Sequence, residues 1–214
     1  MSKGEQTRQR IIEEAARVFN ERGFEGASMS ALMEATGLEK GGIYRHFSGK
    51  EELAAAAFDY AWREAVNART QDLESISNSI AKLKQSIANF VERRAPVPGG
   101  CPLLNTAIDA DDGNATLRKC AQEALREWRE RLIGIIEAGV RRKEIGSGVN
   151  PETVATLLIS SLEGALMMSR LERDSSALAS VRESLEKYLD EEVAAQRKIS
   201  HAGGRRKRRV LKSS

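Results

Sequence analysis

Residues 38–53, LEKGGIYRHFSGKEEL, bring together side chains that can bind a nucleic-acid backbone. Tyr44, Arg45 and His46 are consecutive, and Lys50 follows shortly after them. Their hydroxyl, guanidinium, imidazole and ammonium groups can all donate hydrogen bonds to phosphate oxygens. The same residues would also suit the solvated end of a surface helix, so two interpretations are open.

Three short helices in the first 50 residues would position these side chains. Apolar residues at helical spacing predict a first helix over residues 5–22, which ends at Gly23. Ser28 is suited to cap a second helix, which runs to about residue 35. After a turn at Gly37, the pattern predicts a third helix over residues 39–46.

A turn that contains glycine between two short helices is typical of a helix-turn-helix motif. The second helix of this motif lies in the major groove of DNA. Gly41 and Gly42 have no side chain, so the start of that helix can approach base edges and present its N–H groups to phosphate. Ile43 and Phe47 are four residues apart and would hold the helix on the domain.

Long helices are expected in the rest of the chain. Ser48 and Glu51 form a Ser-x-x-Glu capping box, which predicts a fourth helix that runs to about residue 70. Residues 95–105, APVPGGCPLLN, predict a loop or a broken short helix. The remaining predicted helices cover residues 76–94, 114–143, 151–171 and 176–196.

The composition supports an all-α fold class. Only 4 of the 214 residues are proline, aromatic residues make up 5%, and no run of alternating polarity predicts a strand. The net charge of +3 is unevenly distributed, because residues 197–214 carry eight Lys and Arg and no acid, which leaves −5 on the remainder. This basic tail is expected to be disordered, and it either adds phosphate contacts or only keeps the protein soluble.

The sequence favours a cytoplasmic protein that is nucleoid-associated when it binds DNA. Cys101 and Cys120 are the only cysteines, and the N-terminus has no apolar signal region. The apolar run Val154–Met168 is interrupted by Glu163 and is too short to span a bilayer comfortably. We therefore expect no disulfide and no association with a membrane.

The sequence gives little support to an enzyme. His46 and His201 are the only histidines, so a histidine-based triad or a metal cluster is hard to assemble. No Walker loop, His-Glu-x-x-His motif or dinucleotide-binding glycine pattern is present. We predict a non-enzyme with no metal and no cofactor, and a helical small-molecule-binding module that never touches DNA is the second rival interpretation.

Residues 7–53 resemble the N-terminal domain of the tetracycline-repressor (TetR) family of bacterial transcription regulators. The resemblance runs without a gap from Thr7 to Leu53 and includes "RGF", the Ser28 helix start, "TGLEKGGIYRHF" and "KEEL". It implies a helix-turn-helix DNA-binding domain over residues 1–50 and a helical effector-binding and dimerisation domain over residues 51–196. It also implies a homodimer that binds a palindromic double-stranded DNA operator and is released by a small-molecule effector.

The resemblance also assigns roles to individual residues of the DNA-binding domain. Ser28, Tyr44, His46 and Lys50 match positions that contact phosphates, and Lys40, Gly41, Gly42 and Arg45 match positions that face the groove. Arg45 is the best candidate for base recognition, because arginine to guanine is the commonest specific contact.

Two positions depart from the family pattern, and both bear on the operator sequence. Gly42 replaces a frequent Ser or Thr and so removes a hydroxyl contact, and Glu39 replaces a frequent Ser. An acidic side chain at residue 39 repels phosphate but can accept a hydrogen bond from a cytosine amino group.

The resemblance implies a dimer interface made by the last two long helices. Ser161, Gly164 and Ala165 are small enough for close helix approach, and Leu185, Tyr188 and Leu189 supply apolar area. The alternative is that these faces belong to the core of one protomer. A palindromic operator favours the dimer, because it needs two recognition helices about 34 Å apart.

The middle helices are expected to enclose the effector pocket, although the same residues could be plain core. The candidate lining residues are Trp62, Phe90, Cys101, Leu104, Asn105, Trp128 and Met167. The segment "GGCPLLN" resembles a Gly-Cys-x-x-x-Asn segment of one branch of the family, in which some members sense electrophiles or oxidants through a cysteine. A redox-sensing module that acts through Cys101 is therefore an alternative function, although buried thiols are usually inert.

Overall fold

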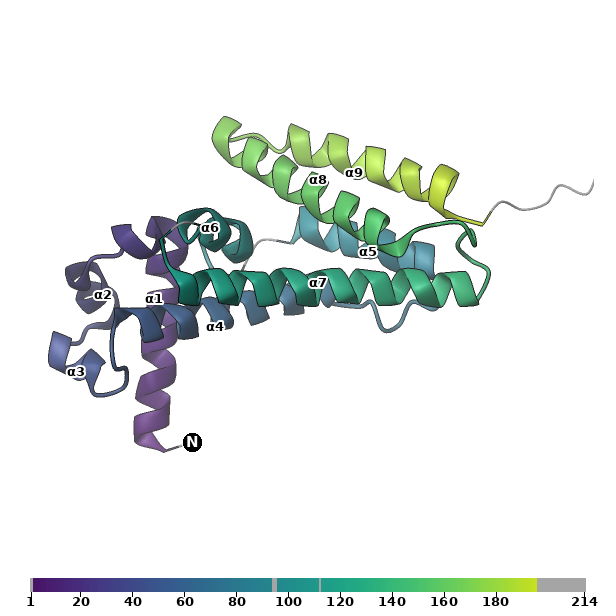
Figure 1. Ribbon diagram of the computed structural model, residues 1–214. Coiled ribbons are helices and arrows are strands. Elements are labelled where there is room, and N and C mark those ends of the chain that lie inside the picture. The colour runs from purple at the N-terminus through teal and green to yellow at the C-terminus, as the bar shows by residue number, and fades with distance from the viewer. Residues whose placement is uncertain (1, 94–95, 112, 196–214) are drawn as a thin grey trace, which may run out of the picture.

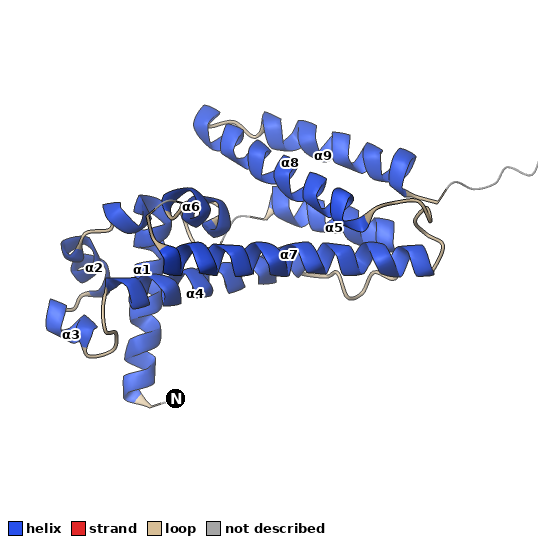
Figure 2. Ribbon diagram, viewed as in Figure 1, coloured by secondary structure: helices blue, strands red, loops and turns tan. Residues whose placement is uncertain are grey.

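The computed structural model describes residues 2–93, 96–111 and 113–195, and the regular elements in these ranges are helices (Figures 1 and 2). The predicted all-α fold class is confirmed, and the basic tail of residues 197–214 lies outside the described residues. In chain order the helices are α1 (Lys3–Gly26), α2 (Met29–Thr36), α3 (Lys40–Tyr44), α4 (Lys50–Thr70), α5 (Ser79–Glu92), α6 (Pro102–Asp109), α7 (Ala115–Arg141), α8 (Pro151–Glu172) and α9 (Ser176–Tyr188).

Helices α1 to α3 and the start of α4 form one end of the molecule (Figure 1). Their shared core is apolar and contains the fully or almost fully buried side chains of Ile11, Leu32, Ile43, Phe47 and Leu53. These apolar contacts fix the short helix α3 on the domain, because five residues are too few for a helix to be stable by itself.

The turn between α2 and α3 has the expected chemistry. Ser28 caps α2, because its side chain accepts a hydrogen bond from the N–H of Ala31. Gly37 ends α2 in the left-handed conformation, with φ 66°, which glycine adopts without steric cost. Helix α3 is shorter than expected, because residues 45 and 46 continue it only as a turn.

The predicted capping box at the start of α4 is wrong by one residue. Gly49 occupies the cap position and makes no side-chain bond there. Ser48 instead donates from both its N–H and its hydroxyl to one carboxylate oxygen of Glu52, each at 2.7 Å. Ser48 does pair with a carboxylate, but with that of Glu52 rather than that of Glu51.

Helix α4 links the N-terminal core to a second and larger core. Leu53 and Ala57 pack in the first core, whereas Trp62 and Ala65 pack in the second. The second core is built from α4, α5, the start of α6, α7, α8 and α9 and from the π-helical turn Leu189–Val193. The expected boundary at residue 50 therefore coincides with the start of a helix that both cores share, and the domain limits stay a prediction.

The antiparallel pair α8 and α9 forms an outer layer over α5 and α7 (Figure 1). Helix α9 is shorter than the predicted helix over residues 176–196, because the π turn follows Tyr188. The Pro- and Gly-rich segment does contain a short helix, α6, which begins at Pro102 because proline suits the first helical position.

Candidate functional site

A set of exposed and partly exposed cations and hydrogen-bond donors lies on and around α3 at the N-terminal end. Ile43 and Phe47 are 0% and 2% exposed, so they hold α3 from beneath, while Lys40, Tyr44 and Arg45 project into solvent. We call the predicted contact residues of this end the recognition surface. They are Ser28, Lys40, Gly41, Gly42, Tyr44, Arg45, His46 and Lys50.

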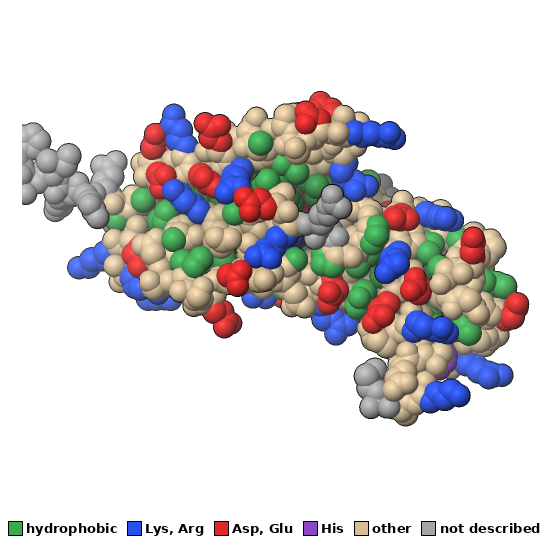
Figure 3. Space-filling view, turned by 180° about the vertical axis from the view of Figure 1, so that it is seen from behind, with side chains coloured by type: hydrophobic (Ala, Val, Ile, Leu, Met, Phe, Trp, Pro, Cys, Tyr) green, Lys and Arg blue, Asp and Glu red, His purple; other side chains and the backbone are tan. Residues whose placement is uncertain are grey.

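The cations of the recognition surface have no acidic partner in the described part of the chain. Lys40, Arg45 and Lys50 take part in none of the ion pairs found between described residues. Lys40 Nζ lies 5.8 Å from the ring centre of Tyr44, and Lys50 Nζ lies 4.4 Å from that of Phe24. Aromatic neighbours position these ammonium groups without neutralising them, so they are available to a polyanion. Figure 3 shows Lys and Arg side chains projecting at this end.

The glycines of α3 are not required by packing within the protein. A Cβ at Gly41 would meet no heavy atom within 4 Å, and a Cβ at Gly42 would lie in ordinary contact, 3.4 Å from Leu38. Since the fold would accept a side chain at residue 41, its absence leaves room for something outside the protein. This geometry is what a helix start needs when its backbone approaches another molecule closely.

A polar cluster lies inside the second core, and we call Arg69, Glu163 and Cys101 the interior triad. The Cys101 thiol donates to Glu163 Oε1 at 2.9 Å, and Arg69 Nη2 lies 3.0 Å from Cys101 Sγ and 3.7 Å from Glu163 Oε1. The Arg69 guanidinium also packs against the rings of Trp62, Phe90 and Trp128, with centroid distances of 5.4, 4.7 and 4.4 Å. Arg69 Nη1 and Glu163 Oε2 are buried and have no hydrogen-bond partner among the described residues.

Burial controls the protonation of the interior triad. It raises the pKa of the Cys101 thiol to about 11, against the opposing effect of Arg69, so the thiol is protonated near neutral pH. Burial also raises the pKa of Glu163, again against the effect of Arg69. Because the thiolate is the reactive form of cysteine, this setting disfavours a sensing role for Cys101.

A cavity of about 330 Å³ lies beside the interior triad, between α4, α5, the start of α6, α8 and α9. Two of the predicted pocket residues, Phe90 and Cys101, line it. Trp62 and Trp128 instead lie behind Arg69, Leu104 is partly buried in the core, and Asn105 lies at a different site. Met167 was expected in the pocket, but its side chain is 46% exposed on the outer face of α8, and Leu166 lines the cavity instead.

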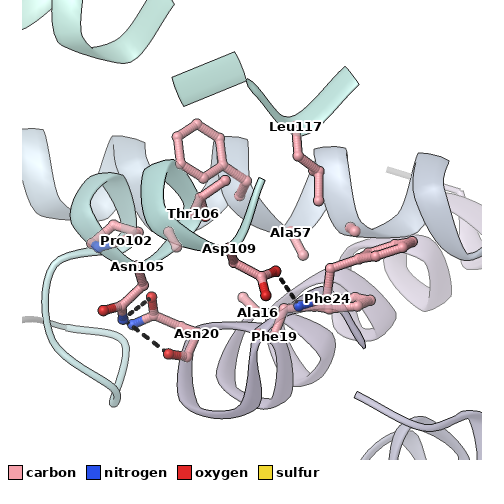
Figure 4. Close-up of a pocket in the computed structure, with 14 residues that line it drawn as sticks. Ala16, Phe19, Asn20, Phe24, Ala57, Pro102, Asn105, Thr106, Asp109 and Leu117 are labelled. Atoms are coloured by element: carbon pink, nitrogen blue, oxygen red, sulfur yellow. Dashed lines mark hydrogen bonds between the residues drawn. The ribbon is translucent and has the colours of Figure 1, made fainter. Parts of the chain in front are cut away.

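Asn105 belongs to a junction between α1 and α6 (Figure 4). Its side-chain amide donates to the backbone carbonyl and side-chain oxygen of Asn20, each at 3.0 Å, and to the carbonyl of Gly99 at 2.9 Å. At the other end of α6, Asp109 Oδ2 accepts a hydrogen bond from the Phe24 N–H at 2.6 Å. The junction thus ties the first helix of the recognition end to the helix that borders the cavity.

The predicted dimer residues separate into two groups. Ser161 and Gly164 lie on the partly exposed side of α8, and Tyr188 is partly buried. Ala165, Leu185 and Leu189 were assigned to the interface, but they are 2%, 5% and 0% exposed in the core of the protomer. Apolar composition cannot distinguish a core face from an interface face, and for these three residues the core interpretation holds.

The outer face of α8 carries large exposed apolar side chains. Leu157, Met167, Met168 and Leu171 are 39%, 46%, 47% and 77% exposed. By length and composition α8 is the one described helix apolar enough to cross a membrane, although 44% of its apolar window is buried within the protein. Clustered exposed apolar side chains mark an interaction site more often than a plain surface.

Several residues of the interior were missed by the sequence analysis. Glu163 could have been recognised from the sequence, because an acid within an apolar helix needs a buried partner. Nothing in the sequence indicates that this partner is Arg69. Asn20 lies on the buried face of α1 and Asp109 is the last residue of α6, yet their contacts join segments far apart in the sequence. Their roles become visible only in the folded chain.

Two family models match the chain in agreement with this architecture. The model described as "Bacterial regulatory proteins, tetR family" matches residues 11–57, and "Tetracyclin repressor-like, C-terminal domain" matches residues 79–185. The HTH-type transcriptional repressor DhaR of Mycobacterium sp. (strain GP1) is 24% identical over 184 residues, which cover 85% of this chain and 88% of DhaR.

Solved structures give the same result over almost the whole chain. A TetR transcriptional regulator from Chloroflexus aurantiacus J-10-FL is 39% identical with a TM-score of 0.87, and the match covers 92% of this chain and 100% of the regulator. A TetR-family regulator from Cytophaga hutchinsonii is 36% identical with a TM-score of 0.86, with coverages of 92% and 99%.

Proposed function

Because this chain belongs to the TetR family of bacterial transcription regulators, with a helix-turn-helix DNA-binding domain, we propose that it is a repressor. As a homodimer it binds a palindromic operator, and a small molecule in the interior cavity releases it. The observation that carries this proposal is the recognition surface, whose exposed cations have no acidic partner among the described residues.

The residues of the recognition surface have two different roles at the operator. Tyr44, His46 and Lys50 contact phosphates together with Ser28, which offers a hydroxyl at the start of α2. Arg45 is exposed beside them and reads a base edge. Phosphate contacts fix the position of a protein on DNA and base contacts supply its specificity, so the two groups have different signatures in binding experiments.

The outer face of α8 supports the homodimer. A Cβ at Gly164 would meet nothing within 4 Å, and the exposed side chains of Met167, Met168 and Leu171 flank this open position. A second copy packed on this face would cover the apolar side chains and place two α3 helices on one side of a duplex. Leu171→Glu should therefore produce monomers in sedimentation velocity, whereas an unchanged sedimentation coefficient would exclude this face.

Two connections support coupling between the cavity and the recognition surface. Helix α4 carries Lys50 at its start and Arg69 near its end, and the two residues are about 28 Å apart along the helix axis. The junction joins Gly99, a cavity-lining residue, to Asn20 of α1 through Asn105. An effector that shifts the dimer from mostly bound to mostly free must prefer the released shape by roughly 10⁴-fold, about 5.5 kcal/mol.

A mobility-shift assay with the DNA that flanks the gene of this protein tests the proposal. Wild-type protein should shift a palindromic fragment at a stoichiometry of one dimer per site, and Arg45→Ala should lose most of the shift. Lys82→Ala on α5 is the matched control, because it removes a partly exposed cation far along the chain from α3. If wild-type and Arg45→Ala proteins bind all fragments equally, the regulator assignment of these residues fails.

A further inference from the structure

The walls of the interior cavity combine apolar surface with an excess of arginine. Most lining side chains are apolar, and Ala65, Phe90, Val97, Leu166 and Leu178 are examples. A volume of about 330 Å³ is within the range of small-molecule sites in proteins. A ligand of this site must therefore have an apolar body of modest size.

The ionic groups among the described residues of the cavity wall are three arginines and one glutamate, namely Arg69, Arg93, Arg170 and Glu92. Two of the four are paired on the protein surface: Arg93 with Asp72 at 3.1 Å, and Glu92 with Arg182. Glu92, the only acid among the described lining residues, is thus already engaged outside the cavity. The charge that is left at the cavity wall belongs to Arg69 and Arg170.

Arg170 takes part in no ion pair among the described residues. It is exposed and also lines the cavity, so it stands where the cavity meets solvent. Its guanidinium lies against the backbone of Gly100, where a Cβ would be only 2.9 Å from Nη1. Gly100 has φ 98° and no side chain, and both features leave space for the guanidinium at this wall.

Arg69 is only partly neutralised by the protein. Its nearest carboxylate oxygen, on Glu163, lies 3.7 Å away, which is longer than a charge-assisted hydrogen bond. Its Nη1 has no acceptor at all among the described residues. Three aromatic rings fix the guanidinium in place, so its charge adds to that of Arg170 at a constant position.

We propose that the effector of this cavity is a small organic anion, with its anionic group held by Arg170 near the positive charge of Arg69 and its apolar body among the lining side chains. This inference rests on the proposed function, because it names the chemical class of the effector. An organic cation would meet two arginines at the cavity wall, and a neutral molecule would leave Arg170 without a counter-ion among the described residues and Arg69 with only Glu163, 3.7 Å away.

Tryptophan fluorescence offers a direct binding readout. The chain has 2 tryptophans, and both Trp62 and Trp128 contact Arg69 at the cavity. Octanoate, 4-phenylbutanoate and 2-naphthoate should each be titrated beside the corresponding primary amide and primary amine. We expect at least one carboxylate to change the emission saturably, with an affinity about tenfold or more above that of its amide and its amine.

Arg170→Gln should abolish this preference for the carboxylate, and because Arg170 is exposed the variant should keep the stability of wild type within about 0.5 kcal/mol. Arg126→Gln is the matched control, because Arg126 is an exposed arginine of α7 that does not line the cavity. If no carboxylate of the panel binds, if amides or amines bind equally well, or if Arg170→Gln keeps the preference, the inference is overturned.

The same proteins separate this inference from the proposed function. Operator binding is measured without ligand by the mobility shift, and then again with each carboxylate. If the protein binds a specific operator and only neutral or cationic compounds release it, the proposed repressor function stands and the anionic effector is refuted. If carboxylates bind but the protein binds no operator, the proposed repressor function is refuted and the anion site is supported.

Discussion

Arg45 on the recognition surface and Arg69 in the interior carry the same guanidinium in opposite surroundings. Arg45 is exposed and has no ion pair among the described residues, whereas Arg69 packs against three aromatic rings beside Glu163 and Cys101. An exposed charge contributes little to folding, so it is free to bind a partner. Removing a buried charge lowers the stability of the protein, because the counter-charge is then left buried and unpaired. The two regions should therefore respond differently to the same substitution.

The largest expected effect is that of Arg69→Ala on stability. The substitution leaves Glu163 buried without its counter-charge and removes the cation from the three rings, so the free energy of unfolding should fall by about 3–5 kcal/mol. Urea denaturation followed by circular dichroism measures this loss. Arg126→Ala, on the exposed side of α7, should change the same quantity by less than about 0.5 kcal/mol. A loss below about 1 kcal/mol for Arg69→Ala would remove the contrast between the two regions.

Arg45→Ala should show the reverse pattern. Operator affinity should fall by about 1–3 kcal/mol and discrimination at one base pair should relax, while the free energy of unfolding stays within about 0.5 kcal/mol of wild type. Competition mobility shifts with single-base operator variants measure both effects. Lys50→Ala is the companion variant, because a lost phosphate contact should lower affinity uniformly and reduce the salt slope by about 1. Equal discrimination by the Arg45→Ala and wild-type proteins would refute base reading by Arg45.

Gly23→Ala tests the junction that joins the two regions. Gly23 has φ 72°, and a Cβ there would lie 2.8 Å from Asp109 Oδ1, so alanine strains the backbone and disturbs the hydrogen bond that the Phe24 N–H donates to Asp109. We expect a loss of about 1–2 kcal/mol in stability, measured by urea denaturation. Gly26→Ala is the control, since its Cβ would make an ordinary contact of 3.5 Å with Arg22. If both variants have the same stability, the junction does not depend on Gly23.

The recognition end could be predicted from sequence because its signals are local. Ile43 and Phe47 are four residues apart and both are buried, as helical spacing predicts, and the expected turn does lie at Gly37. The start of α4 was displaced by one residue because Ser48 and Gly49 are adjacent and both can precede a helix. Errors of this size do not alter which side chains the short helices expose.

The interior was less predictable for a physical reason. Adjacent residues of a helix point about 100° apart, so mistaking Met167 for Leu166 as a cavity residue moves a side chain from the cavity to the outer surface. Helix α8 is apolar on both its buried and its exposed faces, and periodicity cannot say which face is covered by the same chain. Arg69 and Glu163 lie on α4 and α8, and only the tertiary fold brings them together.

The smallest expected effect concerns the charge that opposes Arg69. Burial raises the pKa of Glu163 above its ordinary value of 4.5, so the folded protein binds this proton more tightly than the unfolded chain does. The stability that this difference contributes is fully present below pH 4.5 and is lost as the pH rises through the raised folded pKa. Glu163→Gln lacks this titration, so wild type should lose stability relative to the variant as the pH increases from about 4.5 towards 8.

Urea denaturation of both proteins across this pH range measures that difference, which should stay below about 1.4 kcal/mol for each unit of pH. The pKa of Asp59 is also raised by burial, but Asp59 is present in both proteins and cancels in the comparison. A difference of the opposite sign would mean that Arg69 stabilises the carboxylate more than burial destabilises it. In that case the interior arginine would be fully neutralised by Glu163, and the contrast with the unpaired Arg45 would be sharper still.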